Sequence, residues 1–190
     1  MADKLILDFS VFPTIETDRL LLRAITQEDA AALFELRTNK DVLMFLDRDP
    51  MKSIEETSEF IQTILAAQAR NESIAWTITL KDDPAMLIGN ISLWRIIPQH
   101  FRAEVGYMLH PNHWHKGIMK EALLAVIHYA FHQTELHSLE ANINPENIAS
   151  GSLLKSCGFV QEAYFRENYF YNGVFGDSII FSLINTVSRV

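Results

Sequence analysis

Hydrophobic residues recur at two different spacings along this chain of 190 residues, and these spacings limit the folds that it can adopt. In residues 73–80 a large apolar residue stands at every second position, which is the period of a strand with one buried face. In residues 116–132 the apolar residues recur every three to four positions, as on the buried face of a helix. The chain must therefore combine a sheet with helices.

The same periods, together with turn and capping patterns, divide the rest of the chain into elements. Strands are expected at residues 17–24, 73–80, 86–96, 101–109, 138–143, 160–168 and 174–183. Helices are expected at residues 26–37, 53–70, 116–132 and 147–157. Consecutive strands followed by strand–helix–strand crossovers predict an α+β fold with a mixed sheet of about seven strands and about four helices. Because no linker or repeat appears, we expect one domain over residues 1–190, with residues 1–14 as an N-terminal lead-in.

Composition and charge exclude several classes of protein. Hydrophobic residues make up 48% of the chain, which is enough for a packed core and argues against disorder. The formal net charge of −8 argues against a surface that binds nucleic acid or an anionic membrane. The sequence contains no run of ~20 apolar residues and no pattern of a secretory signal, so a cytoplasmic protein is expected. The single cysteine, Cys157, allows no internal disulfide and is expected in the core at the end of a helix.

The histidines form two groups that are partly similar to metal-binding patterns. His110, His113 and His115 lie in one turn, without an acidic residue or cysteine close by in sequence to complete a site. His128 and His132 are four residues apart on a helix but lack the glutamate of the zinc-binding H-E-x-x-H motif. No metal site is therefore expected.

The most informative segment is residues 104–121, EVGYMLHPNHWHKGIMKE, in which a strand leads through a turn into a helix. The N–H groups at a helix start have no partner within the helix, and they lie at the positive end of its dipole. Gly117 lets a phosphate approach the backbone, and Lys116 and Lys120 add positive charge. The segment is a candidate diphosphate site, and an ordinary strand–turn–helix is the alternative.

A second segment places two polar residues at the start of a helix directly after a strand. It is residues 139–159, LEANINPENIASGSLLKSCGF, and the two residues are Asn147 and Ser150. Considered without other information, both are expected to cap the helix, since asparagine and serine are common capping residues.

These segments together resemble the GNAT acetyltransferases, in the branch of the ribosomal-protein N-terminal acetyltransferases RimJ and RimL. The resemblance covers nearly the whole chain and rests on four pieces in the usual order: TDRLLLR at 17–23, AEVGYMLHP with W-x-K-G at 103–117, NPENIAS at 144–150 and GF at 158–159. It implies a mostly antiparallel, twisted sheet, acetyl-CoA as co-substrate, and an amine acceptor that is a protein N-terminus or a small molecule.

The resemblance also implies a role for each site residue. The residues whose backbone amides would hold the coenzyme diphosphate are His115, Lys116, Gly117, Ile118 and Met119. Those whose backbone would bind the pantetheine arm are Tyr107, Met108 and Leu109, and Asn147 would contact the coenzyme. Glu104 matches the general base, and Ser150 matches the proton donor to the departing thiolate. Met119 departs from the family pattern: its side chain either joins the apolar face of the helix or points at the phosphates.

Strand alternation favours a catalytic place for Glu104. It lies on the face opposite to Ala103 and Val105, beside Gly106, which leaves room for a substrate. The alternative is an ordinary carboxylate on a wet sheet face. An α-amine titrates near ~8 and a lysine amine near ~10.4, so an N-terminal acceptor demands less of the base.

Two further alternatives concern function and the last hairpin. We expect direct attack of the amine in a ternary complex, because Cys157 is expected in the core; a non-catalytic acyl-CoA-binding sensor of the same fold is the rival. Aromatic residues in the hairpin are expected to pack on a sheet face, with one or two reaching the site: Tyr164, Phe165, Tyr169, Phe170, Tyr171 and Phe175. The identity of the acceptor amine and the oligomeric state are not predicted.

Overall fold

The computed structural model describes residues 4–186 and confirms the α+β class. The strands are β1 (Ile15–Glu16), β2 (Leu20–Ala24), β3 (Ile74–Leu80), β4 (Gly89–Ile97), β5 (Arg102–Leu109), β6 (Ser138–Ile143), β7 (Val160–Tyr171) and β8 (Val174–Ile184). The α-helices are α1 (Ala30–Thr38), α2 (Lys40–Leu43), α3 (Ile54–Ala69), α4 (Ile118–His132) and α5 (Ile148–Ser156). The short elements β1 and α2 are additions to the seven strands and four helices that the sequence predicts.

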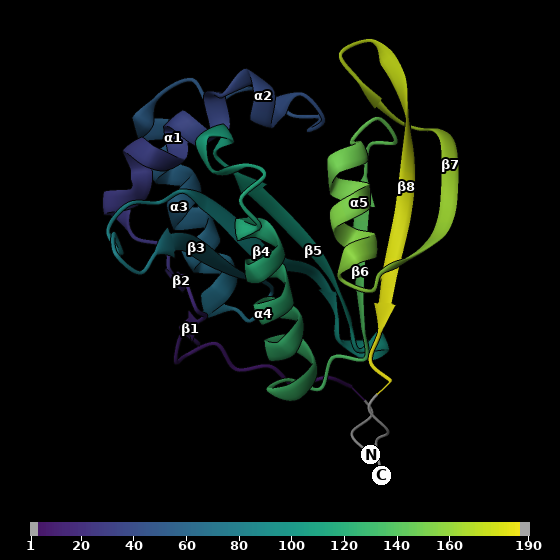
Figure 1. Cartoon of the computed structure of the whole chain (residues 1–190), viewed down its shortest axis with the longest axis horizontal. Coiled ribbons are helices and arrows are strands. Elements are labelled where there is room, and N and C mark those ends of the chain that lie inside the picture. The colour runs from purple at the N-terminus through teal and green to yellow at the C-terminus, as the bar shows by residue number, and fades with distance from the viewer. Residues whose placement is uncertain (1–3, 187–190) are drawn as a thin grey trace.

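The strands form one sheet in the order β1-β2-β3-β4-β5-β6-β8-β7. Neighbouring strands are antiparallel except β5 and β6, which are parallel because α4 crosses over between them. Figure 1 shows α4 and α5 in front of the sheet and the β7–β8 hairpin at its right-hand edge. The mostly antiparallel, mixed sheet agrees with the prediction.

Each face of the sheet has its own hydrophobic core. The larger core packs α4 against the strands and contains Trp76 and Leu123, both fully buried. The smaller core packs α1 and α3 and contains Leu33 and Ile61. Strand alternation sends Val105 into the larger core and the neighbouring even-numbered residues of β5 to the other face.

The N-terminal lead-in is packed although it forms no helix or strand in residues 4–14. Leu5 and Phe9 are buried in the larger core, at 3% and 2% exposure. The indole Nε1 of Trp76 donates a hydrogen bond of 2.7 Å to the carbonyl of Pro13. Residues 1–3 of the predicted lead-in lie outside the described residues.

Strands β5 and β6 pair over only three residues. The ladder joins residues 102–104 to residues 138–140, and beyond Glu104 the two strands separate (Figure 1). Both strands continue, to Leu109 and Ile143 respectively, without a partner on that side. This separation determines where the candidate site lies.

No helix in the described part of the chain has the length and apolar character needed to cross a bilayer.

Candidate active site

A cavity of about 500 Å³ occupies the region where β5 and β6 separate. Its lining includes Glu104 and Tyr107 of β5, Ala141 of β6, and Ser150 of α5. It extends to α1 and α3 on the opposite face, where Arg37 and other side chains complete the lining. The cavity therefore connects the two faces of the sheet at the point where the predicted base and proton donor lie.

Glu104 is a buried carboxylate with one ion pair. It is 8% exposed, and its Oε2 lies 3.2 Å from the Nη1 of Arg95, whose own side chain is 62% exposed. Burial raises the pKa of Glu104 above its ordinary value of 4.5, and the charge and hydrogen bond of Arg95 oppose this. Glu104 is therefore not an exposed carboxylate on an open sheet face, and it lines the cavity. A carboxylate with a raised pKa is a stronger proton acceptor, as a general base requires.

Ser150 is not a helix cap. Its backbone N–H donates to the Oδ1 of Asn147 at 3.0 Å, so Asn147 is the capping residue of α5. The hydroxyl of Ser150 instead shares a hydrogen bond of 2.7 Å with the hydroxyl of Tyr107. Burial raises the pKa of Tyr107 to about 12. The two hydroxyls thus bridge α5 and β5 across the cleft.

The free edge of β5 presents backbone groups to the cleft. Successive residues of a strand point their N–H and C=O groups to opposite edges. The carbonyl of Met108 is directed at β4, where a Cβ on Gly89 would lie 2.5 Å from it. Tyr107 and Leu109 therefore direct their groups toward the β6 side, and the Leu109 carbonyl accepts a hydrogen bond of 2.7 Å from Trp114. The backbone of Met108 faces β4 instead, and its side chain lines the cavity.

The start of α4 presents unpaired backbone amides. Gly117 is the N-cap in a left-handed conformation with φ +75°, and His115 has φ +58°. No N–H of residues 115–119 donates a well-formed hydrogen bond to another residue in the described span 4–186. Such amides at the N-terminus of a helix of 15 residues are suited to an anion.

A cluster of polar contacts, here called the α4 anchor, fixes this turn to the segment before β2. It consists of Thr17, Arg19 and Glu121, with the carbonyl of Lys116. The Arg19 Nε lies 2.7 Å from the Glu121 Oε2, and the Arg19 Nη1 donates to the Lys116 carbonyl at 2.9 Å. The anchor gives the TDR segment at residues 17–19 a structural role, because its side chains hold the turn between β5 and α4.

Met119 and Cys157 both lie in the larger core, each 8% exposed. The side chain of Met119 therefore joins the apolar face of α4 and does not point out of the helix start. Burial raises the pKa of the Cys157 thiol, which disfavours the thiolate form that a nucleophile needs. The prediction that Cys157 is a core residue is confirmed.

The other sequence groups contribute little to this site. Among residues 4–186, no three His, Cys, Asp or Glu side chains are gathered closely enough to hold a metal ion. His128 and His132 are exposed and stack on each other, with ring centroids 4.3 Å apart.

The prediction that the hairpin aromatics pack on a sheet face is largely wrong. Phe165, Phe170 and Phe175 are 48%, 62% and 60% exposed. These residues lie on the β7–β8 hairpin at one end of the sheet, where Phe170 and Phe175 contact each other, with ring centroids 4.9 Å apart. Phe175 and three tyrosines of the hairpin instead line a second cavity of about 570 Å³, which also includes Asp47.

Sequence reasoning missed two side chains of the first cavity. The hydroxyl of Tyr107 was masked by its place in an apolar strand pattern, where only its backbone was assigned a role. Arg37 is 7% exposed and stands four residues after Leu33, on the buried face of α1. A charged residue at an apolar position of a helix was the available signal.

Comparison with known proteins identifies the family of the chain. Residues 19–160 match the family model described as an acetyltransferase (GNAT) domain. The chain is 36% identical, over 92% of its length and 98% of the relative, to the uncharacterized N-acetyltransferase YoaA of Bacillus subtilis (strain 168). It is 28% identical, over 88% of its length and 94% of the relative, to the ribosomal-protein-serine acetyltransferase of Escherichia coli (strain K12).

A solved structure has the same fold. It is the spermidine N-acetyltransferase of Vibrio cholerae in complex with CoA and spermine, with a TM-score of 0.78 and 24% identity, over 88% of this chain and 96% of that one. The family match spans most of the chain, and the relatives include the ribosomal-protein branch that the sequence resembles. The chain therefore belongs to the GNAT family of acetyltransferases and is an N-acetyltransferase.

Proposed function

We propose that this enzyme moves the acetyl group of acetyl-CoA to a primary amine by direct attack within a ternary complex. The observation that carries the proposal is the separation of β5 and β6 beyond Glu104, which opens one cavity to both faces of the sheet. A coenzyme on the α4 and α5 side and an amine on the α1 and α3 side can therefore meet within it.

The residues around the cleft fit the coenzyme. The unpaired amides of residues 115–119 suit a diphosphate, and Lys116 and Lys120 add positive charge beside them. The cleft-side backbone groups of Tyr107 and the N–H of Leu109 suit the amides of a pantetheine arm, which would add to the free edge of β5. Acetyl-CoA supplies the thioester whose acetyl carbon the amine attacks.

Two groups handle the protons of the reaction. Glu104 accepts a proton from the attacking amine, because it is buried at the cavity wall with a raised pKa. On the other side, Ser150 donates a proton to the departing sulfur, and Tyr107 holds the Ser150 hydroxyl at 2.7 Å. The amine nitrogen gains the acetyl group, the carbon–sulfur bond breaks, and the thiol leaves protonated.

The alternative function, a non-catalytic acyl-CoA-binding sensor, is not supported by the position of Met119. That alternative depended on Met119 blocking the diphosphate, and its side chain is packed in the core. A covalent acetyl-enzyme is disfavoured in the same way, since Cys157 is buried with a raised pKa.

Two measurements test the proposal. Calorimetry with acetyl-CoA is expected to show binding, and a thiol-release assay over amines is expected to show turnover. Initial-velocity lines at several acceptor concentrations should intersect, as in a sequential mechanism. Parallel lines together with an acetylated enzyme in the mass spectrum would overturn direct attack, and binding without turnover of any amine would restore the sensor.

A further inference from the structure

Arg37 is a buried cation that forms no ion pair within the described residues 4–186. It is 7% exposed, it lines the first cavity, and its guanidinium lies 4.2 Å over the ring of Phe60. No carboxylate in residues 4–186 forms an ion pair with it, and its buried Nε has no hydrogen-bond partner. Burying a guanidinium nitrogen without an acceptor is unfavourable, so the cavity beside Arg37 suits a ligand group that supplies one.

A second arginine increases the positive charge at this end of the cavity. Arg48 also lines the cavity, and no ion pair within the described chain involves it. Burial, with the nearby charge of Arg48, lowers the pKa of Arg37 to about 10, while Glu56 opposes the shift. Arg48 is exposed, so its charge is partly screened, and an anion bound beside Arg37 would offset the repulsion that remains.

The floor of the same cavity is polar and incompletely paired. Four buried side-chain atoms in the described residues lack a hydrogen-bond partner, and three of them belong to residues that line this cavity: Arg37, Thr77 and Asn90. Thr77 and Asn90 are paired across β3 and β4 and so lie on one face of the sheet. Unpaired buried polar atoms that gather around one cavity are typical of a ligand site.

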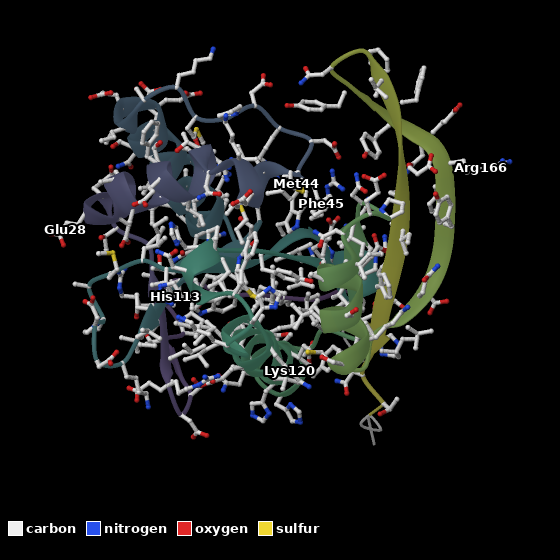
Figure 2. All side chains as sticks on the ribbon, turned by 45° about the horizontal axis from the view of Figure 1, so that its top comes forward. Glu28, Met44, Phe45, His113, Lys120 and Arg166 are labelled. Atoms are coloured by element: carbon white, nitrogen blue, oxygen red, sulfur yellow. The ribbon has the colours of Figure 1, made fainter. Side chains whose placement is uncertain are left out.

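Apolar side chains complete the cavity between its charged groups. They are Phe45, Leu46, Phe60 and Ile64. Figure 2 shows Phe45 near the middle of the molecule, between the helices and the β7–β8 hairpin, whereas Arg166 points away from the outer edge of β7. The cavity thus offers a carboxylate, Glu104, a cation, Arg37, and an apolar wall to one small molecule.

We propose that the acceptor is a small amine that also carries an anionic group, a carboxylate or a phosphate, which Arg37 binds while the amine faces Glu104. This inference rests on the proposed acetyl transfer and specifies its substrate class. A polyamine fits less well, because its positive charges would face Arg37 and Arg48 without a counterion.

Matched acceptors test the anionic group with the wild-type enzyme. We would compare L-leucine with L-leucinamide and 3-methylbutylamine, which lack the carboxylate, and O-phosphoethanolamine with ethanolamine, which lacks the phosphate. Spermidine serves as the polycationic acceptor. At least one anionic member is expected to exceed its neutral counterparts in kcat/KM on the order of ten- to a hundred-fold, as a charge-assisted contact allows. The pair that shows the preference identifies the anion as carboxylate or phosphate.

Variants then assign the preference to Arg37. Arg37→Met keeps a long side chain over Phe60 and is expected to remove the preference for an anionic acceptor over its neutral counterpart, measured as the ratio of their kcat/KM values within each variant. Arg37→Lys should restore part of it. Arg166→Met removes an equal charge from the outer edge of β7 and should leave the preference unchanged. Thermal unfolding of each variant checks that it is folded.

The outcomes separate this inference from the proposed function. Equal or better turnover of the neutral amines, or of spermidine, would overturn the inference and leave acetyl transfer intact. If no amine is acetylated, calorimetry with the enzyme–CoA complex still decides: binding of an anionic acceptor that is lost in Arg37→Met supports the inference while the proposed function fails. Absence of such binding refutes the inference.

Discussion

At the residue scale, Glu104 experiences two opposing influences. Burial destabilises its charged form and raises its pKa, and Arg95 at 3.2 Å stabilises that form. Because Arg95 is largely exposed, solvent screens its charge, and burial dominates the net direction of the shift. The carboxylate is thus kept basic at the wall of the cavity.

Replacing Glu104 with glutamine is expected to lower kcat by about 10²- to 10⁴-fold, the range of general-base catalysis. The substitution removes the proton acceptor but keeps the volume, so the dissociation constant for acetyl-CoA should change little. Thiol-release kinetics and calorimetry measure the two quantities. An unchanged kcat would remove Glu104 from the mechanism.

The same substitution is expected to change how stability depends on pH. A carboxyl whose pKa is raised on folding contributes stability below its unfolded pKa, near 4.5, and loses that contribution as the pH rises through the folded pKa. The difference in Tm between Glu104→Gln and wild type should therefore be more positive at pH 7 than at pH 4. A difference that becomes more negative with rising pH would contradict the assigned shift.

The Ser150 and Tyr107 hydroxyls are expected to act as one unit. Ser150→Ala should lower kcat by roughly 10- to 100-fold, and Tyr107→Phe should lower it less. Because the two groups share one hydrogen bond, the double variant should be little slower than Ser150→Ala alone. Fully additive losses in this double-mutant cycle would show that the hydroxyls act independently.

The alternation of residues along a strand predicted which face of the sheet each side chain occupies. It could not predict contacts between side chains that are distant in sequence. Alternation along β5 placed Glu104 beside Gly106 and opposite to Val105, as observed. The contact between Tyr107 and Ser150 joins residues that are 43 positions apart in the sequence. The unpaired Nε of Arg37 depends on the positions of acceptors elsewhere in the fold. Neither property is encoded in local periodicity.

At the element scale, the α4 anchor positions the helix start. Glu121 accepts hydrogen bonds from Thr17 and from the backbone and side chain of Arg19. Partial burial acts to raise the pKa of Glu121, but these contacts hold it below the ordinary value. Arg19 in turn binds the carbonyl of Lys116, so the anchor holds the turn whose amides face the proposed diphosphate.

Glu121→Gln is therefore expected to weaken acetyl-CoA binding by roughly tenfold, because it loosens charge-assisted contacts to that turn. The matched control is Glu72→Gln, which removes an ion pair with Arg70 whose side chains are 57% and 58% exposed. Such an exposed pair contributes little, so the control should bind normally in calorimetry. Equal affinities for the two variants would argue against the anchor.

Long periodic elements were predictable, and very short ones were not. The helical stripe of α4 and the alternation of β3 extend over several periods, so the pattern is distinct. Strand β1 has two residues and α2 has four, which is too short for any period to show. Helix α2 forms because the side chain of Asn39 accepts hydrogen bonds from the N–H groups of Asp41 and Val42.

At the scale of the whole molecule, helices cover both faces of a sheet whose two central strands separate. α4 packs one face and α1 with α3 packs the other, while the pairing of β5 with β6 ends at Glu104. The two strands that separate are joined through α4 and lie far apart in sequence. The resemblance to a family indicated the cleft, whereas periodicity alone indicated only a mixed sheet.

A crystal structure with bound CoA tests the central claim most directly. We expect the diphosphate oxygens within hydrogen-bonding distance of the amides of residues 115–119, and the pantetheine arm along the cleft edge of β5 between Tyr107 and Ser150. CoA bound elsewhere on the protein, with those amides still unpaired, would contradict the account.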